Sequence, residues 1–153
     1  MNPTDFISLA LKLANSRQEA ELRTAVSRAY YGAFHAAREL LEQCGVGFPP
    51  KELLGADVHT KVRFCLANAD DTETALIANK LSDLRSQRNG ADYDLKTERF
   101  LLSNAKNVAA STQLAIEIAD ALQRCRNEPS FGRFQEKVRS YARDVLRLPV
   151  QDG

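Results

Sequence analysis

The hydrophobic positions of this chain recur with helical spacing almost throughout. Apolar residues return every three or four positions between a few clusters of glycine and proline, and the strict alternation of a half-buried strand is absent. Capping residues and helix breakers divide the pattern into six predicted helices, over residues 4–15, 18–44, 57–68, 70–89, 97–126 and 130–148. The chain is therefore predicted to be all-α, an up-down helical bundle with an extra C-terminal helix.

A few local signals set the predicted helix ends. Gly45 supplies the left-handed backbone that commonly ends a helix, so the second helix is predicted to stop directly before it. Asp57 is the predicted N-cap of the third helix, and Thr97 opens the fifth. Asn89 and Gly90 form a typical helix-ending pair, and the fourth helix is predicted to end there.

The second helix has two faces of different chemistry. At about 100° per residue, its core face is predicted to hold Leu22, Val26, Ala29, Tyr30, Ala33, Ala37, Leu40 and Cys44. The opposite face carries Arg28, Tyr31, His35, Arg38 and Glu42 and is predicted to point away from the core. Such a face is either a solvated surface or, with Tyr31 and His35 one turn apart between arginines, a site for a phosphate-bearing ligand or a partner subunit.

The last predicted helix is amphipathic. Its apolar stripe is Phe131, Phe134, Val138, Tyr141 and Val145, and its basic side holds Arg133, Lys137, Arg139, Arg143 and Arg147. We expect residues 127–153 to form an extension that packs on the bundle of residues 1–126 and leaves its basic side in water. A partner helix or an RNA surface is the alternative role for that side.

Composition limits the classes of function. The net charge of +1 gives no strong overall field for nucleic acid, so any RNA binding must depend on a local patch. No apolar run reaches the roughly 20 residues that span a bilayer, and the three cysteines form no CxxC pair, so we expect a cytoplasmic protein without a membrane partner. Gly-rich phosphate loops and metal-spaced clusters are missing, so no cofactor and no metal are expected.

The segment LRSQRNGADYDL, residues 84–95, has two interpretations. In the structural interpretation, Arg85 and Arg88 complement the dipole at a helix end, and Asp92 stabilises the turn that follows. In the functional one, the same arginines hold a phosphate.

Two motifs together resemble the HEPN superfamily of small bacterial and archaeal helical domains. They are SRAYYGAFHAAR at residues 27–38 and RNGADYD at residues 88–94, and His59 also stands where many relatives have a histidine. The resemblance covers roughly residues 5–126 and leaves residues 127–153 outside.

The resemblance implies a four-helix core that usually forms a homodimer, with the arginine turns of two subunits across a shared cleft. In catalytic members the turn reads Arg-Asn, three variable residues and His, and the domain is a metal-independent endoribonuclease. Several members belong to toxin-antitoxin or defence systems, commonly beside a nucleotidyltransferase partner.

This chain departs from that pattern at Tyr93, which occupies the position of the family's catalytic histidine. A tyrosine hydroxyl is almost entirely protonated at neutral pH and is a poor base for the ribose 2′-hydroxyl. His35, His59 and Asp92 are the alternatives for that role. The departure leaves RNA or nucleotide binding as an expectation and leaves cleavage open.

Two functional hypotheses follow. In the first, the chain binds RNA or a nucleotide, with catalytic positions Arg88, Tyr93 and His35 if it cleaves; the predicted phosphate-binding residues are Arg28, Tyr31, Arg38, Arg85, Asn89 and Asp92. In the second, a non-catalytic dimeric module binds a nucleotidyltransferase or another protein, and Tyr93 is a site to which such a partner adds nucleotides.

Overall fold

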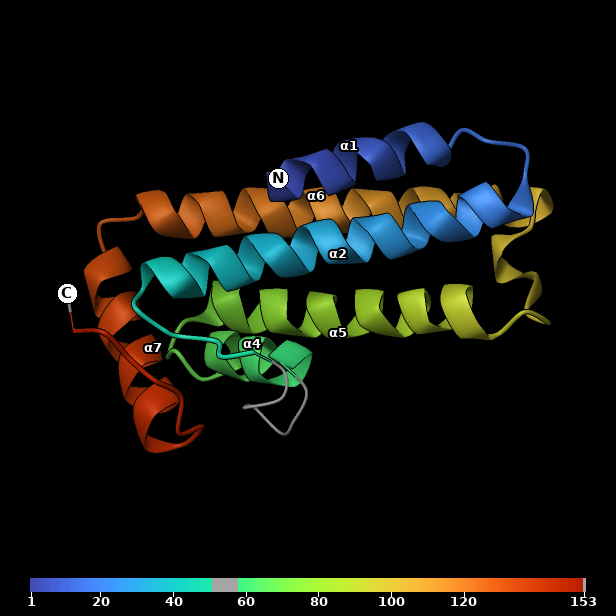
Figure 1. The fold of residues 1–153 in the computed structure, drawn as a ribbon. Coiled ribbons are helices and arrows are strands. Elements are labelled where there is room, and N and C mark those ends of the chain that lie inside the picture. The colour runs from blue at the N-terminus through green and yellow to red at the C-terminus, as the bar shows by residue number, and fades with distance from the viewer. Residues whose placement is uncertain (51–57, 153) are drawn as a thin grey trace. The chain divides into compact units, whose positions relative to one another are not determined.

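The computed structural model describes residues 1–50 and 58–152, and most of them are helical (Figure 1). The described α-helices are α1 (Pro3–Leu13), α2 (Glu19–Gln43), α4 (Val58–Ala67), α5 (Thr72–Tyr93), α6 (Ala105–Asn127) and α7 (Phe131–Asp144). Two short 3-10 helices, Glu98–Phe100 and Leu102–Asn104, precede α6, and no β-strand occurs in the described ranges. The predicted all-α bundle is confirmed, whereas the predicted cap at Asp57 lies outside the described residues.

The chain divides into two compact units, each built from two separate segments. Unit 1 comprises residues 1–36 and 80–119, and unit 2 comprises residues 37–79 and 120–153. Helices α2, α5 and α6 each contribute one part to either unit. The boundary predicted near residue 126 stays a prediction.

In unit 1 the chain direction alternates between α1, α2, α5 and α6 (Figure 1). The predicted core face of α2 is confirmed, because all eight of its residues are buried. Around it, one apolar cluster joins Leu22, Ala25, Val26, Ala91, Phe100 and Val108. Gly32 lets α1 approach closely, since a Cβ there would lie 2.6 Å from Ile7 Cγ1.

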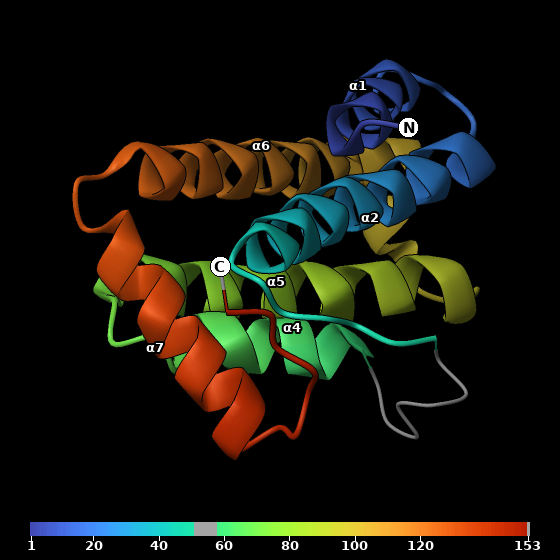
Figure 2. The ribbon, with the colours of Figure 1, turned by 60° about the vertical axis from the view of Figure 1, so that its left-hand side comes forward.

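In unit 2, helix α7 packs against α4 (Figure 2). The buried residues of α7 are Phe134, Val138 and Ala142. The predicted stripe was wrong at Val145, which is 59% exposed, and α7 ends before the predicted Leu148. The chain turns away after α7, with Arg147 at a φ of 56°, so Leu148 reaches the interior from outside the helix.

The chain that follows α7 lies along residues 45–47 of unit 2. Gly47 donates its N–H to Pro149 O at 2.7 Å, and Gln151 donates its N–H to Gly45 O at 2.8 Å. Gly45 has the predicted left-handed backbone, with φ of 92°, and a Cβ there would lie 2.4 Å from Gln151 O. Only glycine fits a position that needs both this φ and this close approach.

The three cysteines are free and buried in unit 2. Burial raises the pKa of Cys44 and of Cys65 to about 12, and that of Cys125 to about 11. Thiols of such high pKa are poor nucleophiles at neutral pH, so these side chains are packing residues. None of the described helices is both long and apolar enough to cross a membrane.

The predicted end of the fourth helix was wrong, because α5 continues through Asn89-Gly90 to Tyr93. Gly90 faces the buried ring of Phe100, where a Cβ would meet the ring at 3.7 Å. Arg88 and Asp92, one turn apart, form an ion pair that spans the predicted helix end at Asn89-Gly90. Tertiary contacts therefore override a local stop signal.

The real end of α5 is capped by an arginine from α2. Arg23 is 8% exposed and donates from Nη1 to the carbonyls of Ala91 at 3.0 Å and Asp94 at 2.9 Å, and from Nη2 to Thr97 O at 3.0 Å. Its Nε lies 2.7 Å from Glu19 Oε1. One guanidinium thus supplies the donors that the last carbonyls of a helix lack.

The predicted start of the fifth helix was also wrong. Thr97 caps the 3-10 helix Glu98–Phe100, and α6 begins only at Ala105. Leu101, with ψ of 156°, is extended and separates this 3-10 helix from the next one, and the neighbouring Phe100 is buried. Thr97 does open a helix, but that helix is the three-residue 3-10 helix and not the long α-helix that was predicted.

We predict that Arg23→Ala lowers the free energy of unfolding by about 3 kcal/mol, because it leaves several carbonyls at the end of α5 without a donor. Urea denaturation measures the change. Arg17→Ala is the control, since Arg17 is exposed and its loss should change stability by no more than about 0.5 kcal/mol. Equal effects of the two substitutions would contradict the capping role.

Candidate functional site

The candidate site lies in unit 1, where Arg88 on α5 meets Tyr31 on α2. Arg88 Nη2 donates to the Tyr31 hydroxyl at 2.7 Å, and its guanidinium carbon lies 5.2 Å from the centre of the Tyr31 ring. The two motifs that stand far apart in the sequence therefore converge on one place.

Asp92 and Asn89 hold the Arg88 side chain, which is 16% exposed. Asp92 Oδ2 lies 2.8 Å from Arg88 Nε, and Asn89 Oδ1 accepts from Nη1 at 2.9 Å. The Nε–H does not point at the carboxylate, so this contact is an ion pair rather than a directed hydrogen bond. Ser27 adds a hydrogen bond to the same carboxylate oxygen at 3.3 Å. Arg88 is thus fixed in place while donors on its two Nη groups remain for a ligand.

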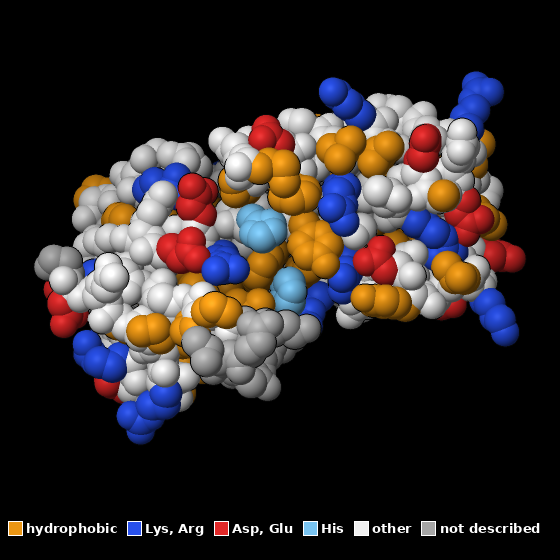
Figure 3. All heavy atoms as spheres, viewed as in Figure 1, with side chains coloured by type: hydrophobic (Ala, Val, Ile, Leu, Met, Phe, Trp, Pro, Cys, Tyr) orange, Lys and Arg blue, Asp and Glu red, His pale blue; other side chains and the backbone are white. Residues whose placement is uncertain are grey.

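Aromatic rings and guanidinium groups alternate along the site. The order is Phe6, Arg28, Tyr31, Arg88 and Tyr93, and each guanidinium carbon lies between 5.1 and 5.6 Å from the ring centres on either side of it in this order. We call these five residues the stacked row. Figure 3 shows hydrophobic, basic and histidine side chains next to one another on the face over α2. Planar cations beside ring faces gain cation–π attraction.

Arg28 differs from Arg88 because it has no acidic partner in the part of the chain that the structure describes. Its Nη2 lies 3.4 Å from Ser27 Oγ, its Nε has no hydrogen-bond acceptor, and no carboxylate of the described residues lies within 4 Å of it. Two guanidinium groups therefore flank Tyr31, and among residues 1–50 and 58–152 one carboxylate, that of Asp92, forms an ion pair with them. The local excess of positive charge favours an anion.

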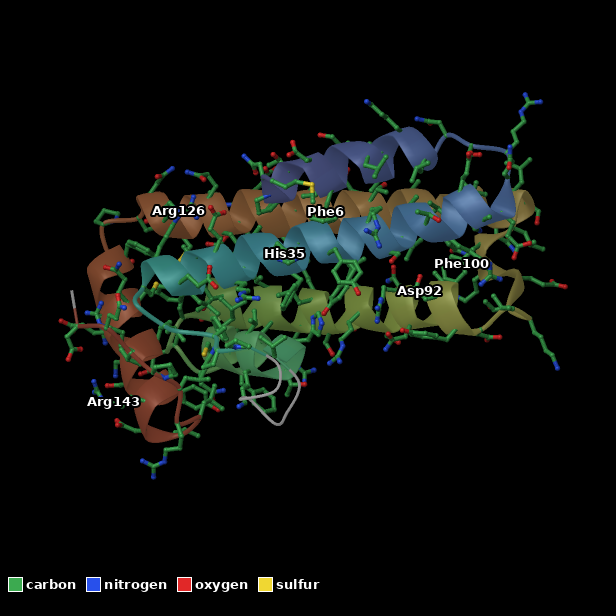
Figure 4. The ribbon with its side chains drawn as sticks, in the orientation of Figure 1. Phe6, His35, Asp92, Phe100, Arg126 and Arg143 are labelled. Carbon is green, nitrogen blue, oxygen red and sulfur yellow. The ribbon has the colours of Figure 1, made fainter. Side chains whose placement is uncertain are left out.

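His35 packs beside the stacked row on α2. Its ring stacks on Phe6 at 5.5 Å and on Tyr31 at 6.3 Å, and it meets the edge of Phe34 at 5.2 Å. Figure 4 shows Phe6 from α1 close to His35. The face predicted to point away from the core is thus only half exposed, because Phe6 covers part of it.

Phe6 is the site residue that the sequence did not reveal. It belongs to an ordinary amphipathic helix, and nothing in its neighbourhood distinguishes it from a core residue. The close approach of α1 at Gly32 was the one available signal, and it requires knowledge of which helix lies opposite.

The other predicted residues are placed as follows. Arg85 is half-buried on α5 in unit 1, one turn before Arg88. Arg38 belongs to unit 2, where it pairs with Glu42 at 2.8 Å and lies over the Phe48 ring. His59 is half-buried on α4, also in unit 2. Arg38 and His59 are therefore not members of this unit 1 cluster.

Residues 1–50 and 58–152 contain no group of three His, Cys, Asp or Glu side chains that could hold a metal ion. The polar groups that the described cluster offers are its guanidinium groups, its hydroxyls, the Asn89 amide, the Asp92 carboxylate and the His35 ring.

Comparisons with known proteins add one relative. No protein family matches the chain, and neither does any solved structure. An uncharacterized protein of Methanocaldococcus jannaschii is 28% identical over 130 residues, which cover 77% of this chain and 78% of that protein. Its description assigns no activity, so the HEPN resemblance rests on the two motifs and stays a prediction.

We predict that Tyr31 and Arg88 are energetically coupled by about 1 kcal/mol, because their hydrogen bond is charge-assisted but partly exposed. A double-mutant cycle with Tyr31→Phe and Arg88→Ala, read by urea denaturation, measures this coupling. The exposed Arg99 provides the control, since Arg99→Ala and Tyr31→Phe should be additive. A coupling of zero in the first cycle would show that the contact contributes nothing to stability.

Proposed function

We propose that this chain is a HEPN-type domain that binds RNA or a nucleotide through Arg88 and Arg28. The observation that carries the proposal is that both guanidinium groups lie against the Tyr31 ring, and that Asp92 is the one carboxylate of the described residues that pairs with either of them. A phosphate is the anion that best fits such a pair, because planar guanidinium groups match its oxygens in a bidentate way.

The partial burial of the two arginines strengthens the case. Arg88 is held by Tyr31, Asn89 and Asp92 before any ligand arrives, so little side-chain entropy is lost on binding. Charge interactions are also stronger where the surroundings are partly apolar. The rings of the stacked row supply those surroundings.

The described residues support binding better than cleavage. A metal-free ribonuclease needs a base for the 2′-hydroxyl, a donor for the leaving oxygen and a cation at the phosphate. Arg88 provides the cation. Tyr93 is a poor base, and Asp92 is already paired with Arg88, so His35 is the remaining base within unit 1. Its ring stacks on Tyr31, whose hydroxyl touches Arg88.

We predict that Arg88→Ala lowers the affinity for a short single-stranded RNA at least tenfold, because one phosphate contact is lost. Fluorescence anisotropy at several salt concentrations measures binding, and the salt slope should fall by about 1 in the variant. Lys106→Ala removes the same charge from an exposed position on α6 and should leave affinity within about twofold. Both variants are first checked for folding by urea denaturation.

Equal binding by wild type, Arg88→Ala and Lys106→Ala would overturn the proposal, as would an absence of RNA and nucleotide binding by the folded protein. The same samples, kept with a chelator, show whether RNA is cleaved. Cleavage that is lost in His35→Gln and in Arg88→Ala would extend the proposal to a metal-independent endoribonuclease.

The exposure of Tyr93 favours a second function, that of an interaction module modified by a nucleotidyltransferase. Its side chain is 72% exposed, so a partner enzyme can reach the hydroxyl. In that case, mass spectrometry of the protein co-expressed with its genomic neighbour should show added nucleotide mass on Tyr93. Unmodified protein from such cells would remove this candidate.

A further inference from the structure

We infer that Tyr93 is a stacking platform for an unpaired nucleobase, and that the ligand of the site is therefore a single-stranded nucleic acid or a nucleotide rather than a duplex. The inference rests on the proposed function, because it assumes that Arg28 and Arg88 hold the phosphate. It assigns to the position of the family's catalytic histidine a role in recognition instead of proton transfer.

The first support is the exposure of the ring. Tyr93 is 72% exposed, while Tyr30 is 2% exposed and Tyr31 is half-buried. The Arg88 guanidinium lies 5.5 Å from the centre of the Tyr93 ring, so one contact of the ring is with a planar cation. Tyr93 ends the stacked row, and most of its surface is open for another planar group.

The second support is the rigid backbone beneath this exposed ring. Arg23 binds the carbonyls of Ala91 and Asp94, which stand on either side of residues 92 and 93. Asp92, the residue directly before Tyr93, forms an ion pair with Arg88. An exposed aromatic ring on a fixed backbone loses little freedom when a base stacks on it, because tyrosine has few rotatable bonds.

The third support is the distance between the ring and the phosphate donors. The Arg88 guanidinium lies beside the Tyr93 ring and also donates a hydrogen bond to the Tyr31 hydroxyl. A phosphate bound to Arg88 would therefore lie next to Tyr93. In a nucleotide the base and its phosphate are joined through one sugar, which suits such neighbouring contacts. Arginine with aromatic rings is the usual composition of single-strand sites, since every base has a flat face to stack.

This arrangement discriminates against duplexes. The faces of a paired base are covered by its neighbours in the helix, so an exposed ring can stack only on a base that is free of the stack.

Leu95 and Leu102 are also exposed, at 76% and 51%, but their aliphatic side chains cannot replace a ring as a stacking partner. They provide matched controls in the same part of the chain.

The absence of tryptophan from the chain permits a direct test. In the Tyr93→Trp variant, the single indole reports on stacking because a base that stacks on it quenches its emission. We expect a short single-stranded oligonucleotide to quench this emission, and an abasic oligonucleotide of the same length to bind with the emission almost unchanged. Binding without quenching by the base-containing oligonucleotide would overturn the inference.

Affinity measurements separate the ring from its hydroxyl. We expect Tyr93→Phe to bind the single-stranded oligonucleotide within about twofold of wild type, and Tyr93→Leu to lose about tenfold, as alanine substitutions of stacking residues do. Neither substitution should change affinity for the abasic oligonucleotide. Leu95→Ala should leave both affinities unchanged. A loss in Tyr93→Phe as large as that in Tyr93→Leu would overturn stacking and assign the role to the hydroxyl.

The outcomes also separate this inference from the proposed function. If wild type binds neither oligonucleotide, the proposed function fails and the inference with it. If Arg88→Ala weakens binding of both oligonucleotides but Tyr93→Leu weakens neither, the phosphate site stands and only the base platform is wrong. Equal wild-type affinity for a duplex and a single strand, together with no loss of affinity in Tyr93→Leu, would likewise show that only the base platform is wrong.

Discussion

The arrangement of unit 1 depends on the buried guanidinium of Arg23. A helix ends with carbonyl groups that need donors, and near the end of α5 the carbonyls of Ala91 and Asp94 lie beside the buried Arg23 side chain. Arg23 provides the donors from α2 and so fixes where α5 stops and where the chain bends toward Phe100. The cap acts together with the Ser27–Asp92 hydrogen bond to hold the last turn of α5, which carries Asp92 and Tyr93, beside α2.

Three arginines of unit 1, Arg23, Arg28 and Arg88, show how surroundings decide what one chemical group does. Arg23 is almost fully buried and its donors are directed at backbone carbonyls and Glu19, so it holds the fold. Arg88 is held by Asp92, Asn89 and Tyr31, and its side chain keeps 16% of its surface exposed. Arg28 lies over two rings with no carboxylate of the described residues within reach. Positive charge that no described carboxylate compensates favours the binding of an anionic ligand.

Much of the fold followed from local patterns. The eight core residues of α2 were predicted because one helix period determines which side chains share a face, and Gly45 was predicted because its backbone conformation is rare for other residues. The meeting of Tyr31 with Arg88 was expected from the two motifs together. What local patterns could not give was any feature that depends on a distant partner. Asn89-Gly90 reads as a helix end unless Arg23 and Phe100 are known to lie opposite.

Phe6 illustrates the same limit for the site. A phenylalanine on an amphipathic helix is ordinarily a core residue, and its contact with Arg28 and His35 depends on how closely α1 and α2 approach. Val145 shows the reverse error, because a helical stripe was extended past the real end of α7. In both cases the periodicity was right, and the missing information was the position of another segment.

The contacts of Gly45 and Gly47 with Pro149 and Gln151 bear on how the protein folds during synthesis. Residues 37–79 leave the ribosome long before residues 149–151, yet their glycine turn is completed only by those later residues. Both segments of unit 1 have been made by then. The nascent chain therefore carries an unfinished unit 2 until residues 149–151 have been made, and its apolar helices are the segments that a ribosome-bound chaperone would shield.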